Sequence, residues 1–303
     1  YGFSATPDEI IDELLIAYPN GRQQTWFQRS FDRRSKKPLW KFGPKFKGPH
    51  KLWRDATRNN GLFLSTAVQL NNEQLKDIFS WFQQKVVVVA SGVVLNPALT
   101  HQLLANKDGK SSVLEFMSAA DVGIDDIELS RRSLSGARNP QGPFQGQLVI
   151  GNGGLEAISI KVIHRDLETK EPIPFDIDDE SEGTQKLLLS AGGWLKVLQD
   201  GGVLFVDELN NSLHPLLVRF LIDLFHNKIA NKKHAQLIFS THDTSILDKD
   251  IFRRDQVWFV SKDKTNATAL YALSDFSPRK DDAFERNYLK GRYGALPNIG
   301  EFA

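Results

Sequence analysis

The chain has no cysteine among its 303 residues and no long hydrophobic run. The missing cysteines exclude disulfides and cysteine-ligated zinc, and they suit a reducing compartment. The longest apolar stretch, Val86 to Leu95, is interrupted by Ser91 and Gly92 and is much shorter than the roughly 20 residues of a membrane span. A net charge of +1 gives no overall attraction for nucleic acid. We therefore expect a cytoplasmic protein without a membrane segment, built from one large or two modest domains.

Short aromatic segments bounded by Pro, Asn and Gly fill residues 1–54, which predicts antiparallel strands. The apolar piece from Ile10 to Ala17 is ambiguous, and turn residues follow it at 18–21. Residues 33–54 combine Lys and Arg with several aromatics, so they could bind nucleic acid through phosphate contacts and base stacking. The alternative is a solvated hairpin whose aromatics pack inward.

Residues 55–154 are predicted to form a mainly helical insertion. Helices are expected from Glu73 to Gln84 and from Ser112 to Ala120. The segment from 131 to 154 has little periodicity and much Gly and Pro, which predicts a loop.

Strands and helices alternate in residues 155–303. The strand "LEAISIKVIHR" precedes a helix near Thr184 to Leu198, and the strand "VLFV" precedes a second helix with Leu217, Leu221 and Leu224 on one face. The strands "AQLIFS", "QVWFVSKD" and "ATALYALSDF" follow. The pattern predicts an α/β fold, with a mixed, partly parallel sheet flanked by helices and an antiparallel β and helical insertion.

Two carboxylates, Asp207 and Glu208, follow the apolar strand "VLFV" directly. Ligands of open α/β sheets bind beyond the carboxyl ends of the strands. Phosphoryl transfer needs one acid at such an edge to hold Mg²⁺ and one to orient or deprotonate water. By itself the pair is more typical of a strand that stops at a charged turn.

The next apolar strand ends in "STHD", which places His242 at the same predicted edge. An imidazole there can hydrogen-bond a terminal phosphate oxygen. A serine-hydrolase interpretation of Ser240, His242 and Asp243 is weak, because side chains of neighbouring strand residues do not converge and no G-x-S-x-G elbow exists.

Ser181-x-Gly183 stands just before the helix near residue 184. A hydroxyl, a glycine and free amides at a helix start form a phosphate receptor, although a capped helix start would look the same. A calcium loop through Asp176, Asp178 and Glu180 fails, because its sixth position is Ser181 and its twelfth is Leu187.

In this order the motifs resemble those of ABC-type and SMC-type ATPases: "ESEGTQ" their signature, "VLFVDE" their Walker B strand, "NNSLHP" their D-loop and "STHD" their switch histidine. Together with "YGFSAT", "TRNNGLFLSTAVQLNN", "RRDQVWFVSKD" and "GRYGALP", they resemble a bacterial family of AAA-type ATP-binding proteins of abortive-infection and phage-defence loci, related to OLD-type ATPases. The resemblance spans nearly the whole chain and implies an ABC-type ATPase domain.

The resemblance implies a role for each motif residue. Asp207 would hold Mg²⁺ through water, Glu208 would polarise the attacking water, and His242 would sense the γ-phosphate of ATP. The D-loop residues Asn210 and Ser212, the former often Asp in the family, would border the nucleotide. The signature residues would touch ATP on a partner subunit, so that two subunits share each site; these residues are Ser181 and Gly183.

Such an enzyme needs a Walker A loop, G-x-x-x-x-G-K-[ST]. The one candidate contains Gly109, Lys110 and Ser111, but Leu104 stands where the first glycine belongs, and the residues before it are helical in pattern. We interpret it as a solvated turn between helices. Because the chain begins at Tyr1 without a methionine, we expect the Walker A segment upstream of it, and poor nucleotide binding by this chain alone.

The sequence thus predicts an ATP- and Mg²⁺-dependent ATPase that acts as a dimer. It would switch a separate effector, such as a nuclease or toxin, in antiviral defence. The alternative is an ATPase-fold scaffold that binds a protein partner or nucleic acid without turnover.

Overall fold

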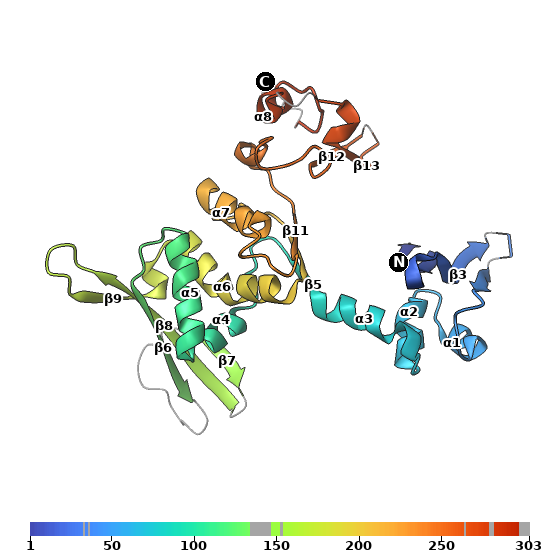
Figure 1. The fold of residues 1–303 in the computed structure, drawn as a ribbon, viewed down its shortest axis with the longest axis horizontal. Helices are drawn as coiled ribbons and strands as arrows, with labels where there is room; N and C mark the ends of the chain where they lie inside the picture. Colours follow the sequence, from blue (N-terminus) through green and yellow to red (C-terminus); the bar gives the residue numbers. More distant parts are fainter. Residues whose placement is uncertain are drawn as a thin grey trace. The chain divides into compact units, whose positions relative to one another are not determined.

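The computed structural model describes residues 1–32, 34–35, 37–133, 147–151, 154–263, 265–278 and 282–296 (Figure 1). It divides into two compact units, Tyr1–Val86 and Val87–Ala303. By packing, the helices up to residue 85 belong with the N-terminal strands. The three segments expected from the sequence, 1–54, 55–154 and 155–303, stay a prediction about functional organisation.

An antiparallel sheet and three helices make up the N-terminal unit. Its strands pair in chain order and are β1 (Gly2–Ala5), β2 (Ile10–Ala17), β3 (Gln24–Asp32) and β4 (Lys37–Phe42). The helices are α1 (His50–Ala56), α2 (Phe63–Gln69) and α3 (Glu73–Lys85). The predicted strands, the turn (η1, Pro19–Gly21) and the helix from Glu73 are confirmed, and the ambiguous piece is a strand.

The aromatic residues of the basic stretch pack inward. Phe46 and Trp53 are 2% and 4% exposed, and Trp40 and Phe42 pack against the same core around Phe63. Their rings therefore form part of the hydrophobic core of the unit. Any nucleic-acid contact of this stretch would depend on its exposed basic side chains.

A buried carboxylate fixes the start of α2. Glu13 accepts hydrogen bonds from the amides of Phe63 and Leu64, at 2.7 and 3.0 Å, and from the Tyr1 hydroxyl at 2.9 Å. The free amides of a helix start need acceptors, and an anion there also favours the helix dipole. Burial nevertheless raises the pKa of Glu13, since desolvation outweighs these bonds and the Arg29 charge.

A three-stranded sheet in the order β11-β10-β5 organises the second unit. The strands are β5 (Val86–Val89), β10 (Val203–Val206) and β11 (Gln236–Phe239), and β10 and β11 are parallel. The helices α6 (Glu182–Asp200) and α7 (Pro215–His226) are the ones predicted on either side of β10. Apolar residues of both helices and both strands belong to one core, which includes Leu188, Leu204 and Leu221.

A separate antiparallel sheet precedes α6. It contains β6 (Asp126–Ser133), β7 (Gln147–Gly151), β8 (Gly154–Arg165) and β9 (Pro172–Asp176), followed by η2 (Ile177–Asp179). The predicted loop over 131–154 is therefore wrong at its two ends, because backbone pairing with β8 extends into it, and its middle lies outside the described residues.

Two helices, α4 (Pro97–Leu104) and α5 (Lys107–Ala119), contact α6. The expected solvated turn at Gly109 is wrong, since α5 begins at Lys107 and makes Gly109, Lys110 and Ser111 helical. A Cβ at Gly109 would lie 2.5 Å from the Leu103 carbonyl oxygen, so tight helix packing accounts for this glycine. The segment follows a helix, as predicted, and is no phosphate loop.

The C-terminal elements form a small cluster around Tyr293, which is 1% exposed and stacks on Phe259. These elements are the antiparallel pair β12 (Trp258–Lys262) and β13 (Thr268–Ala272), η4 (Leu273–Phe276) and α8 (Phe284–Leu289). Before them, η3 (Thr244–Ile246) contributes Ile246 to the core of α6 and α7. The tyrosine of the "GRYGALP" segment is thus a core residue.

Candidate functional site

The carboxyl ends of β10 and β11 bring polar side chains to one edge. Ser240 follows β11, and its hydroxyl donates to Asp207 Oδ1 at 2.6 Å while accepting from the Glu208 amide at 2.8 Å. The backbone continues the strand pairing, because Leu209 N donates to Ser240 O at 3.0 Å. Parallel pairing of two short apolar strands therefore places both acids beside the "STHD" segment.

Glu208 faces His242. Its Oε2 lies 2.6 Å from His242 Nδ1, and its backbone has a φ of 56°. A left-handed conformation costs a non-glycine residue on the order of 1 kcal/mol and is concentrated at functional sites. The side chains of Glu208 and His242 are 37% and 75% exposed, so the pair is accessible to a ligand.

Asn210 completes a chain of hydrogen bonds. Thr241 Oγ1 donates to Asn210 Oδ1 at 2.6 Å, and Asn210 Nδ2 lies 3.1 Å from His242 Nε2. Because Nε2 faces a donor and Nδ1 faces a carboxylate, the arrangement fits an imidazole with its proton on Nδ1. Both ring nitrogens of His242 therefore have partners within the site.

The start of α6 forms a second group. Ser181 is the N-cap, and its Oγ accepts from Thr184 N at 3.1 Å. Glu182 Oε1 accepts from the Ser212 hydroxyl at 2.7 Å. A Cβ on Gly183 would lie 2.7 Å from the Ser212 carbonyl oxygen, so glycine is required for this approach. The segment around Ser212 thus contacts the start of α6 in the same chain.

The predicted residues therefore fall into two adjoining groups. Asp207, Glu208, Asn210 and His242 lie together, and Ser181, Gly183 and Ser212 lie at the helix start. The segment from Glu208 to Ser212 joins the groups, and its end residues both have positive φ.

Three contributors were not assigned from the sequence. Ser240 and Thr241 orient the acid and the amide, and Lys186 donates to the Asn211 carbonyl at 2.7 Å. Ser240 and Thr241 come directly after an apolar strand, which is a signal in the sequence. No spacing rule indicates Lys186. Ser240 Oγ bonds to Asp207, which gives a nucleophilic serine no support.

The chemistry of the edge fits Mg²⁺ in part. Asp207 and Ser240 offer hard oxygen atoms, and Mg²⁺ is usually held by one or two carboxylates with waters and substrate phosphates. Within the described ranges no group of three or more His, Asp or Glu could hold a metal ion. The edge therefore fits a metal that arrives with a phosphate ligand better than a metal bound by protein alone.

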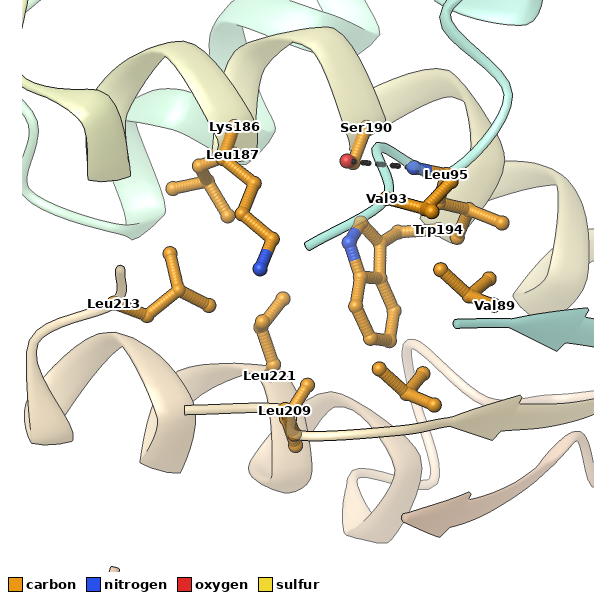
Figure 2. A pocket seen from close by; sticks show the side chains of 11 residues that line it. Val89, Val93, Leu95, Lys186, Leu187, Ser190, Trp194, Leu209, Leu213 and Leu221 are labelled. Carbon is orange, nitrogen blue, oxygen red and sulfur yellow. Dashed lines mark hydrogen bonds between the residues drawn. The ribbon is translucent and has the colours of Figure 1, made fainter. Parts of the chain in front are cut away.

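An adjacent cavity is too small for a nucleotide. It measures about 20 Å³, room for one water, and apolar side chains such as Leu187, Trp194 and Leu209 line it (Figure 2).

None of the helices that the structure describes has the length and apolarity to cross a membrane.

Fold and site together define an α/β domain with acids, an amide and an imidazole at the carboxyl ends of two parallel strands. The family model described as "AAA domain, putative AbiEii toxin, Type IV TA system" matches residues 1–248 of the 303, so the chain belongs to that family. Comparison with curated proteins finds no match. Membership supports an AAA-type ATPase family linked to abortive infection. The relation to OLD-type ATPases stays a prediction.

Proposed function

We propose that this chain forms part of an ATPase that binds and hydrolyses ATP with Mg²⁺ in a dimer, and that the cycle switches a separate effector in abortive-infection defence. The observation that carries the proposal is the Glu208–His242 pair at 2.6 Å, beside Asp207 at the same strand edge. Family membership supports the ATPase class and the link to toxin–antitoxin systems.

Each acid has a distinct role in this proposal. Ser240 fixes one oxygen of Asp207, and the other carboxylate oxygen would hold Mg²⁺ when the ion is bound. His242 engages one oxygen of Glu208, which leaves Oε1 to accept a proton from the attacking water. When bound, Mg²⁺ would neutralise charge on the phosphate oxygens.

His242 must exchange a partner to contact a phosphate. Its Nε2 lies beside the Asn210 amide, and an oxyanion in that place requires a proton on Nε2. Contact with the γ-phosphate would therefore free Asn210, which lies in the D-loop. The proposal gives His242 the role of reporting ATP to this loop.

Dimer formation is proposed from the start of α6. Ser181 is exposed at the N-terminus of a 19-residue helix, where the hydroxyl, free amides and helix dipole favour an anion. We assign the γ-phosphate of ATP on a partner subunit to this position. A Walker A loop, which such an enzyme requires, would hold the rest of that nucleotide.

The test is Glu208→Gln in full-length protein, including any residues that precede Tyr1. We expect hydrolysis to fall by at least about 100-fold, because the carboxylate base is lost, while an ATP-bound dimer accumulates. Glu168→Gln, an exposed position in the turn between β8 and β9, is the matched control. Equal turnover in Glu208→Gln and wild type would reject the role of Glu208.

The competing function is a scaffold that binds a protein or nucleic acid without turnover. It predicts no phosphate release by wild-type protein under any ATP concentration, with partner binding unchanged in Glu208→Gln. Nucleic-acid binding through 33–54 would then be lost on charge reversal of Lys41 and Lys45, both exposed.

A further inference from the structure

Three residues in the first two turns of α6 contact the D-loop. Glu182 and Gly183 stand four and three residues before Lys186, so each lies on the side of the helix where Lys186 lies. The first two contact Ser212, and Lys186 Nζ donates to the carbonyl oxygen of Asn211 at 2.7 Å. All three contacts fall on two adjacent D-loop residues.

The backbone of Asn211 faces both groups of the site. Its amide donates to the Glu208 carbonyl at 2.9 Å, while its own carbonyl accepts from Lys186. A second turn follows, in which Leu213 N donates to Asn210 O at 3.1 Å. A shift of the Asn211 peptide would therefore be transmitted to Glu208 on one side and to Asn210 on the other.

Lys186 is held in an apolar setting. Its ammonium points toward the small cavity beside Leu187, Leu213 and Leu221 (Figure 2). Burial lowers the pKa of Lys186, with the Glu182 charge opposing that effect. An ammonium in such surroundings needs a fixed acceptor, and a hydrogen bond from a charged donor is stronger than one between neutral groups.

We propose that Lys186 is a positioning residue for ATP hydrolysis, which holds the Asn211 carbonyl and thereby couples the start of α6 to Glu208 and Asn210. The inference rests on the proposed ATPase function. In the proposed coupling, a phosphate that binds at Ser181 and Gly183 moves α6, and Lys186 transmits that movement to the D-loop.

The variant that tests the coupling is Lys186→Met, which keeps an apolar stem and removes the ammonium. In full-length protein we expect kcat to fall about 10- to 100-fold with KM for ATP changed less than about threefold. Lys186→Arg retains a charged donor and should recover at least about a third of the wild-type kcat. Lys196→Met, on the same helix but paired with Asp200, is the control and should match wild type.

A second measurement does not depend on turnover. Amide hydrogen exchange of Asn211 and Leu213 should accelerate at least about fivefold in Lys186→Met and remain as in wild type in Lys196→Met. Unchanged exchange, an unchanged kcat, or a loss expressed only in KM would each overturn the role of Lys186. If exchange is faster in Lys186→Met but the wild-type protein hydrolyses no ATP, the proposed ATPase function is rejected. The role of Lys186 in hydrolysis is then rejected with it.

Discussion

The Ser240 hydroxyl donates a 2.6 Å hydrogen bond to Asp207 and accepts one from the amide of Glu208. A single side chain directly after β11 thus orients both acidic residues that follow β10. The relationship explains how two short strands produce a defined pair of carboxylates at an exposed edge.

Ser240→Ala should lower ATP turnover about 10- to 100-fold, because the hydroxyl that fixes Asp207 and the Glu208 backbone is removed. A higher Mg²⁺ concentration should be needed for half-maximal rate. The measurement is a Mg²⁺ titration of phosphate release. Ser245→Ala is the control, since Ser245 is exposed and its backbone amide bond to Asp243 survives the change. Identical Mg²⁺ curves for wild type and Ser240→Ala would contradict this prediction.

Gly183→Ala should disable the site with moderate loss of stability. The new Cβ would lie 2.7 Å from the Ser212 carbonyl oxygen, so α6 and the D-loop must separate at a cost of about 1–3 kcal/mol. Calorimetry measures the free energy of unfolding, and phosphate release measures activity. Gly2→Ala, where nothing lies within 4 Å of the added carbon, should change neither. A Gly183→Ala protein with full activity would show that this contact is dispensable.

Substitutions of Ser181 should distinguish its role as the N-cap of α6 from a contact with phosphate. In Ser181→Ala, loss of the bond to Thr184 N lowers the free energy of unfolding by about 1 kcal/mol. If Ser181 also touches ATP on a partner, ATP-dependent dimerisation measured by sedimentation should weaken at least about tenfold. Ser181→Asp restores a helix cap but repels phosphate, so it should keep stability and still lose dimerisation. Wild-type dimerisation in both variants would remove Ser181 from the site.

Glu13 should make the N-terminal unit sensitive to pH. Burial raises the pKa of Glu13 in the folded protein above its value in the unfolded chain, which is about 4.3. When the pH rises above this unfolded value, the folded unit therefore binds more protons than the unfolded chain. Stability is therefore highest below that value, falls as pH rises through the folded pKa, and levels off above it. Hydrogen exchange of the Phe63 and Leu64 amides, measured against pH, reports this change.

Glu13→Gln should remove that pH dependence. The amide group places a donor against a backbone donor, so we also expect a loss of about 1–3 kcal/mol near neutral pH. Tyr1→Phe removes one hydroxyl bond and keeps the carboxylate, so it should retain the pH dependence. An equal slope of stability with pH in Glu13→Gln and wild type would assign the effect to another group.

Local patterns determined much of this chain. Helical spacing predicted α6 and α7, apolar runs predicted β10 and β11, and residues after those runs predicted Asp207, Glu208 and His242 as neighbours. These predictions succeeded because burial of an apolar face and the end of a parallel strand are properties of a few consecutive residues.

The tertiary structure alone decided the remaining features. The sequence predicted a solvated turn around Gly109 rather than a phosphate loop, yet packing on α4 made these residues helical. Pairing with β8 likewise gave β6 and β7 strand structure in a segment of weak periodicity. The bond from Lys186 to Asn211 and the buried Glu13 at the start of α2 join residues 25 and 50 positions apart. Contacts of that range depend on how elements pack, which no local spacing of residue types records.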